Sequence, residues 1–86
     1  MRAAQRCLDS AAKRLGLAAG DAQAAADAGA TECVGHTDRL ALATLHCQPQ
    51  SNYLRLREAF RSAARERVLS QIDLVRAAAG KAEAGR

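Results

Sequence analysis

The feature that most limits what this chain can fold into is its longest stretch without a helix breaker. From Ser51 to Ala79 there is no glycine or proline. Apolar residues recur there every three or four positions, as on one face of an α-helix: Tyr53, Leu56, Phe60, Ala64, Val68, Ile72, Val75 and Ala79. A separate row is formed by Arg57, Arg61 and Arg65. We therefore expect one long amphipathic helix, with Ser51 or Asn52 as its N-cap.

The segment before this helix predicts a tight turn and a second helix. Pro49 lies in "HCQPQSN", the stretch richest in turn-forming residues, so we place a turn at 48–52. Upstream, Leu40, Leu42 and Leu45 form an apolar cluster that should face the stripe of the long helix. The turn is short enough to make the two helices antiparallel neighbours.

The N-terminal half predicts weaker helical structure. The second helix can extend back towards Asp21 as N-cap, with a break near Gly29 and Gly35, because glycine costs a helix interior about 1 kcal/mol. Residues 2–19 show helical spacing and should form a third, weaker helix. The predicted fold is all-α: residues 1–86 form a single small domain, an antiparallel helical hairpin with a weaker third helix, and self-association or a partner completes the bundle.

Composition explains why a partner is expected. Of the 42 hydrophobic residues 22 are alanine, and the chain has no tryptophan, one phenylalanine and one tyrosine. Burying a leucine-sized side chain contributes roughly 1.5–3 kcal/mol, against roughly 1–2 kcal/mol for ordering each residue. So small a set of large side chains predicts that some apolar surface is buried against another chain.

The charge distribution leaves a second function open. The net charge is +4, and residues 44–86 carry eight basic and four acidic groups. This excess is compatible with a small basic helical protein that binds nucleic acid or has a regulatory role. Against that alternative, the chain has no recognisable helix-turn-helix and no aromatic platform for single strands.

Both histidines and two cysteines lie close together in the sequence: Cys33, His36, His46 and Cys47. On a continuous helix, Cys33 and Cys47 would be about 21 Å apart along the axis, too far to share a metal ion. No arrangement typical of a nucleophile and its base is present. We therefore predict no metal, no cofactor and no catalytic residue, with the cysteines acting as small packing residues.

The predicted location of the protein in the cell rests on three features that the sequence lacks. Three cysteines in no paired spacing do not indicate a disulfide framework. The N-terminus lacks the apolar core of a secretory signal, and no window approaches the roughly 20 apolar residues of a membrane span. These features favour a cytoplasmic protein with reduced thiols and no membrane association.

One stretch, "QPQSNYLRLREAFRSAARERVLSQIDLV", resembles the second half of the small type III secretion co-chaperones, which help hold the needle subunit in the bacterial cytoplasm. In that family a short polar turn leads to an aromatic residue and a long helix ending in an Ile/Val-rich turn, a pattern matched by Tyr53, Leu56, Phe60 and Ile72. The resemblance covers roughly residues 45–76, and the glycine-containing N-terminal part does not share it. It implies a larger chaperone and a secreted helical subunit as partners.

These observations favour a non-enzymatic helical adaptor or chaperone over a nucleic-acid binder. The chain would bind a partner protein, or a second copy of itself, through the apolar stripe of the long helix. Its predicted contact residues are Tyr53, Leu56, Phe60, Val68, Ile72 and Val75, with Phe60 as the anchor.

Overall fold

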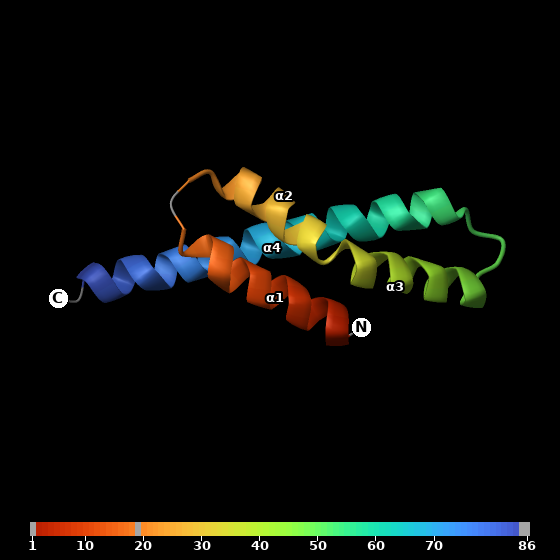
Figure 1. Cartoon of the computed structure of the whole chain (residues 1–86), viewed down its shortest axis with the longest axis horizontal. Helices are drawn as coiled ribbons and strands as arrows, with labels where there is room; N and C mark the ends of the chain where they lie inside the picture. The colour runs from red at the N-terminus through yellow and green to blue at the C-terminus, as the bar shows by residue number, and fades with distance from the viewer. Residues whose placement is uncertain (1, 19, 85–86) are drawn as a thin grey trace.

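The computed structural model describes residues 2–18 and 20–84, which form four α-helices joined by short turns (Figure 1). The helices are α1 (Arg2–Gly16), α2 (Ala22–Glu32), α3 (Val34–Cys47) and α4 (Tyr53–Ala84). Because no strand occurs among these residues, the prediction of an all-α fold is confirmed for the described part of the chain. The molecule is long and thin, with principal extents of 56, 22 and 15 Å.

The arrangement is organised along α4. Figure 1 shows α1 and α2 crossing the middle of α4, while α3 lies beside its N-terminal part. α2 and α3 both run antiparallel to α4. Two ion pairs show this: Asp27 pairs with Arg65, and Asp38, which follows Asp27 in the chain, pairs with Arg61, which precedes Arg65 on α4. The two helices therefore behave as one broken helix laid against α4.

Local signals place the helix boundaries. Asp21 caps α2, its Oδ1 accepting a hydrogen bond from the backbone N–H of Gln23 at 3.0 Å. Asn52 caps α4, accepting from the N–H of Leu54 at 2.9 Å. The predicted break falls at Cys33, whose backbone leaves the helical region at φ −101° and ψ 9°. The predicted third helix is shorter than expected, since α1 ends at Gly16, whereas α4 continues to Ala84.

The core lies where α1 and α2 cross α4. Its buried members are Leu8, Ala11, Ala12, Ala26, Cys33, Ala64, Val68 and Ile72. Three of the eight come from α1, so the N-terminal helix belongs to the centre of the core. Its alanine-rich face looked weak in the sequence, but small side chains let helix axes approach closely.

The face that α3 turns towards α4 differs from the prediction. Its buried residues are Thr37 and Ala41, whereas Leu42 remains 47% exposed. Leu40 and Leu45 are half-buried. Leu42 is therefore covered less than the prediction implied: successive helical residues point about 100° apart, so burying Ala41 places Leu42 at the edge of the contact, where it shares a hollow with Tyr53 of the stripe.

Cys7 of α1 and Cys33 at the α2–α3 break form a disulfide, and Cys47 is free and exposed. The prediction of reduced thiols is wrong for this pair, and Cys33 is more than a packing residue. The two cysteines are separated by 26 residues, and packing of α1 beside the break brings them together. The predicted cytoplasmic location rested partly on reduced thiols, and the disulfide removes that support, because disulfides persist mainly in oxidising compartments.

Arginines of α4 connect it to each of the other helices. Arg67 donates two hydrogen bonds to Asp9 of α1, at 3.0 and 3.1 Å, and Arg76 donates to the backbone carbonyl oxygen of Gly16. With the pairs to α2 and α3, these contacts use all four arginines from position 61 to position 76. The row that looked like a separate charged face is largely engaged inside the molecule.

Gly29 is buried in α2 against α4. A Cβ atom at this position would lie 2.9 Å from Cγ1 of Val68, which is fully buried. Gly29→Ala should lower the free energy of unfolding by about 1–3 kcal/mol, because overpacking outweighs the roughly 1 kcal/mol that alanine adds to a helix. Urea denaturation followed by circular dichroism measures this change.

Two variants serve as controls for this prediction. A Cβ at Gly35 of α3 would meet nothing within 4 Å, so Gly35→Ala should not destabilise the protein. In a Val68→Ala background the contact with position 29 disappears, and Gly29→Ala should become neutral or stabilising. Equal effects at positions 29 and 35 would contradict close packing of α2 on α4.

Candidate protein-binding surface beside α3 and α4

The predicted contact stripe of α4 is divided by the tertiary structure. Val68 and Ile72 are fully buried by α1 and α2, so a partner could reach them only by displacing those helices. Val75 is half-buried next to Gly16, where a Cβ would lie 3.4 Å from its Cγ1. The remaining members, Tyr53, Leu56 and Phe60, are half-buried in the part of α4 that lies beside α3.

That part of the molecule carries an apolar surface which we call the end surface, defined by Leu42, Leu45 and Tyr53, with Leu54 exposed next to Tyr53 in the sequence. Leu42 is 47% and Leu54 60% exposed. Between α3 and the following turn lies a hollow of about 400 Å³, lined by Leu42, Leu45, His46, Pro49, Ser51 and Tyr53. An exposed cluster of large apolar side chains around a hollow is typical of a protein-binding site.

A second apolar hollow, of about 250 Å³, lies where α1, α3 and α4 meet. Leu8, Leu40 and Phe60 supply its largest apolar side chains, and Arg67 lies at its edge. Phe60, the predicted anchor, therefore lines a hollow together with side chains of the N-terminal half of α1 as well as of α3.

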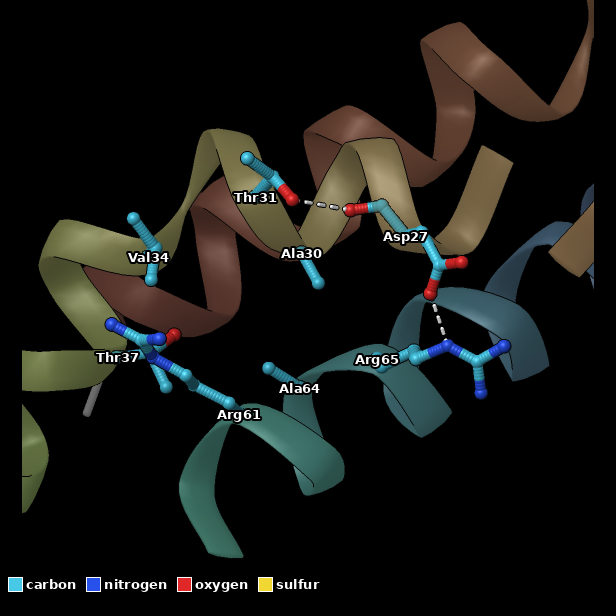
Figure 2. Close-up of a pocket in the computed structure, with 8 residues that line it drawn as sticks. All are labelled: Asp27, Ala30, Thr31, Val34, Thr37, Arg61, Ala64 and Arg65. Atoms are coloured by element: carbon cyan, nitrogen blue, oxygen red, sulfur yellow. Dashed lines mark hydrogen bonds and ion pairs between the residues drawn. The ribbon is translucent and has the colours of Figure 1, made fainter. Parts of the chain in front are cut away.

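A third hollow, of about 470 Å³, opens at the α2–α3 break (Figure 2). Small side chains form its floor, and Arg61 and Arg65 of α4 lie at its two ends. Both of its threonine hydroxyls donate to backbone carbonyl oxygens, Thr31 to Asp27 at 2.8 Å and Thr37 to Cys33 at 3.2 Å. Both hydroxyl protons of the hollow are therefore used within α2 and α3.

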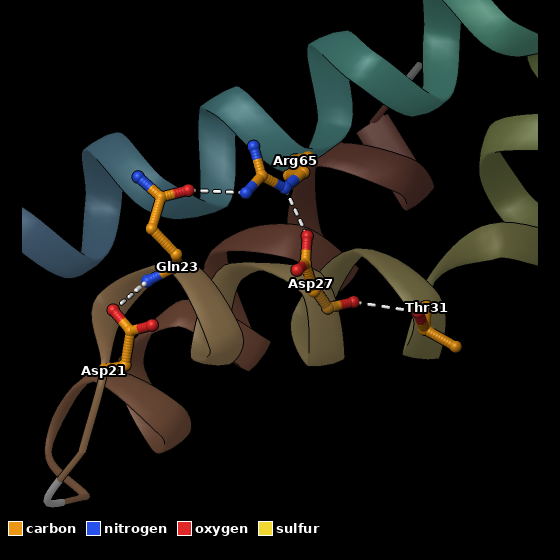
Figure 3. Close-up of polar contacts among 5 residues, drawn as sticks. All are labelled: Asp21, Gln23, Asp27, Thr31 and Arg65. Carbon is orange, nitrogen blue, oxygen red and sulfur yellow. Dashed lines mark hydrogen bonds and ion pairs between the residues drawn. The ribbon is translucent and has the colours of Figure 1, made fainter.

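The arginine at one end of this hollow is held by α2. Figure 3 shows Arg65 reaching Asp27 through Nε and the side-chain oxygen of Gln23 through Nη2. Asp21, at the start of the same helix, accepts from the N–H of Gln23. Arg65 is thus committed to α2 and is not a free cation for a ligand.

Arg61 is engaged in the same way by α3. It donates from Nε and Nη2 to the two oxygens of Asp38, at 3.1 and 2.8 Å. These hydrogen bonds are the main reason that the pKa of Asp38 lies below its ordinary value, and the positive charges of Arg61 and Arg57 lower it further. A carboxyl group with a lowered pKa stays ionised at neutral pH, so Asp38 acts as an ion-pair partner and not as a proton donor.

Arg57 differs from its two neighbours in the row. Its guanidinium carbon lies 5.9 Å from the centre of the Tyr53 ring, within the range of a cation–π contact. Among the described residues, no acceptor lies within hydrogen-bond distance of its Nε, although that atom is buried. The sequence placed Arg57 in the arginine row but did not distinguish it from Arg61 and Arg65.

The cysteines and histidines do not come together. Cys33 is bonded to Cys7, Cys47 and His46 are exposed, and His36 is half-buried on α3. Across residues 2–18 and 20–84, no group of three His, Cys, Asp or Glu residues is placed to hold a metal ion. Within the same ranges, no helix is long and apolar enough to cross a membrane.

Comparison of the chain with protein-family models, with curated proteins and with solved structures found no match. The resemblance of residues 45–76 to type III secretion co-chaperones therefore stays a prediction. What the chain does has to be argued from its own surface, and the end surface is the strongest candidate for a functional site.

Proposed function

We propose that this chain is a non-enzymatic helical adaptor that binds another protein chain through the end surface and the adjoining residues Leu56 and Phe60. The observation that carries the proposal is the uneven covering of α4. The middle of α4 is buried by α1 and α2, while the N-terminal part, which holds both aromatic residues, lies beside α3 and leaves Leu42 and Leu54 about half exposed or more. A further helix from a partner would complete the bundle at this end.

The proposal has a narrower form that follows from the family resemblance. As a type III secretion co-chaperone, the chain would use its helical hairpin to help a larger chaperone hold a secreted helical subunit in the bacterial cytoplasm, where Cys7 and Cys33 would be held reduced. Three of the four residues that carry the resemblance, Tyr53, Leu56 and Phe60, lie in the proposed contact region. The fourth, Ile72, is a core residue and would act through stability alone.

Substitution of exposed leucines tests the adaptor proposal. Leu42→Asp should weaken partner binding about tenfold or more, since it places a charge in an apolar contact without burying one in the free protein. Leu17→Asp is the matched control, because Leu17 is 70% exposed in the turn after α1 and lies beside Arg76 and Gly80 of α4, away from the end surface. Quantitative cross-linking in native extracts, followed by calorimetry with the purified partner, measures the effect.

Light scattering on the same variants measures whether the chain forms a dimer, in which case the partner is a second copy of itself. A dimer that Leu42→Asp dissociates and Leu17→Asp does not would also support the adaptor function. The proposal fails if Leu42→Asp retains every partner at unchanged affinity, or if the folded monomer binds duplex DNA tightly and no protein.

A further inference from the structure

The starting point is the regular row of arginines at four-residue spacing on α4. Arg65 pairs with Asp27 of α2, and Arg61 pairs with Asp38 of α3. Each carboxylate comes from the helix that packs beside that turn of α4. The next member of the row, one turn nearer the start of the helix, is Arg57.

The position opposite Arg57 is apolar. α3 and α4 run in opposite directions, so moving one turn back from Arg61 corresponds to moving one turn forward from Asp38, which leads to Leu42. Arg61 and Arg65 each have a carboxylate opposite them, whereas this register places an exposed leucine opposite Arg57, and the nearby Asp38 is hydrogen-bonded to Arg61 instead. This explains why its buried Nε has no acceptor among the described residues and why the guanidinium lies over the ring of Tyr53 instead.

A buried guanidinium N–H without an acceptor is unfavourable, so an incoming carboxylate would be stabilised here. The Arg57 side chain as a whole is only half-buried, and a group from outside the molecule can approach it. Tyr53, over which Arg57 lies, also lines the hollow of about 400 Å³ beside Leu42 and Leu45. The guanidinium of Arg57, whose Nε has no hydrogen-bond acceptor among the described residues, thus lies over a ring that lines an apolar hollow.

The two helices beside the end surface carry more free basic than free acidic side chains. Arg39 of α3 and Arg57 of α4 make no ion pair with a described residue, whereas the acidic side chain of this part of α4 without an arginine partner is Glu58; Arg55 lines a different hollow, with Leu56 and Ala59. A surface with this balance attracts a negatively charged partner.

We propose that Arg57 and the adjoining hollow form a binding site for an acidic amphipathic helix of a partner protein. An Asp or Glu of that helix pairs with Arg57, and an apolar side chain on its neighbouring turn fills the hollow between Leu42 and Tyr53. This inference rests on the proposed adaptor function and adds the chemistry of the partner to it.

Two other occupants fit less well. A second copy in a symmetric dimer would bring the same basic surface against itself, which opposes association. Nucleic acid binding draws on several free cations along one face, and two of the three arginines in this row are already neutralised by Asp27 and Asp38.

A selection experiment with charge reversal tests the site. A phage-displayed library of amphipathic helical peptides, in which the residues beside the apolar stripe vary among Asp, Glu, Lys, Arg and Ser, is selected on the disulfide-bonded full chain. We expect the recovered peptides to carry Asp or Glu one turn from an apolar anchor. Replacing that acid by lysine should weaken binding at least tenfold, measured by fluorescence anisotropy with labelled peptide.

Variants of the protein then test whether the acidic residue of the peptide pairs with Arg57. Arg57→Glu should reverse the preference, so that the lysine peptide binds more tightly than the acidic one. Arg55→Glu changes the net charge equally on the same helix and should leave the preference as in the wild type. Arg57→Gln keeps a polar side chain and should bind the two peptides with similar affinity. It tests the same pairing if Arg57→Glu does not fold.

The possible outcomes separate this inference from the adaptor function. Peptides selected without an acid, which bind wild type and Arg57→Gln equally but lose binding to Leu42→Asp, would overturn the acidic-helix site and leave the adaptor function standing. Recovery of no peptide that depends on Leu42 or Arg57 would count against both. A dimer dissociated by Leu42→Asp, or tight duplex DNA binding lost in Arg57→Gln, would overturn the site in favour of a second copy or nucleic acid.

Discussion

Replacing Cys7 and Cys33 together by alanine should lower the free energy of unfolding by about 3.5 kcal/mol. The estimate follows from the 26-residue separation of the two cysteines, because cross-linking a loop of that length reduces the conformational entropy of the unfolded chain by about this amount. For a domain of this size the loss is a large fraction of the total stability. The disulfide also joins α1 to the α2–α3 break, so we expect α1 to detach first.

Denaturation in guanidinium chloride with and without reductant provides the measurement. The oxidised wild type should unfold at a higher denaturant concentration than both the reduced wild type and the Cys7→Ala/Cys33→Ala variant. Cys47→Ala is the control, because Cys47 is free and exposed, and it should match the wild type. Identical midpoints for the oxidised wild type and the double variant would show that Cys7 and Cys33 are not joined.

Ile72→Ala should have the second large effect, lowering the free energy of unfolding by about 2–5 kcal/mol. Ile72 is fully buried, and its side chain packs where α1 ends, next to Gly16. Removing most of that side chain leaves a cavity in a core that otherwise consists largely of alanine, with few large neighbours able to collapse into it.

Leu74→Ala is the matched control for this core prediction. Leu74 lies two residues further along α4 and is 61% exposed, so its truncation should change stability by no more than about 0.5 kcal/mol. Urea denaturation of the two variants decides the matter. A small loss for Ile72→Ala together with a large loss for Leu74→Ala would mean that α1 and α2 cover a different face of α4.

Much of the secondary structure could be predicted because its determinants are local. The long helix follows from a stretch without breakers and from apolar residues at helical spacing, and its start follows from Asn52. The cap of α2 at Asp21 is of the same kind. Each of these depends on residues within a few positions of one another, so the chain itself contains the whole signal.

The candidate site could be predicted only in part. The stripe of α4 correctly marked an apolar face, but periodicity does not say which neighbour covers which turn. Val68 and Ile72 look like Phe60 in the sequence, yet two of these residues are fully buried by α1 and α2 and the third is not. In the same way, the neighbouring residues in the sequence do not distinguish Arg57 from Arg61. The two differ in the residue of α3 opposite them, which is Asp38 for Arg61 and Leu42 for Arg57.

The sequence by itself determined that the chain is helical, where α2 and α4 begin and that its large apolar side chains are few. Tertiary structure alone decided that Cys7 meets Cys33, that α1 enters the core and that Arg61 and Arg65 are paired. The reason is physical. Helix propensity and capping act over one or two turns. The disulfide and these ion pairs join residues that are 23 to 38 positions apart in the sequence, and only the packing of the helices brings such residues together.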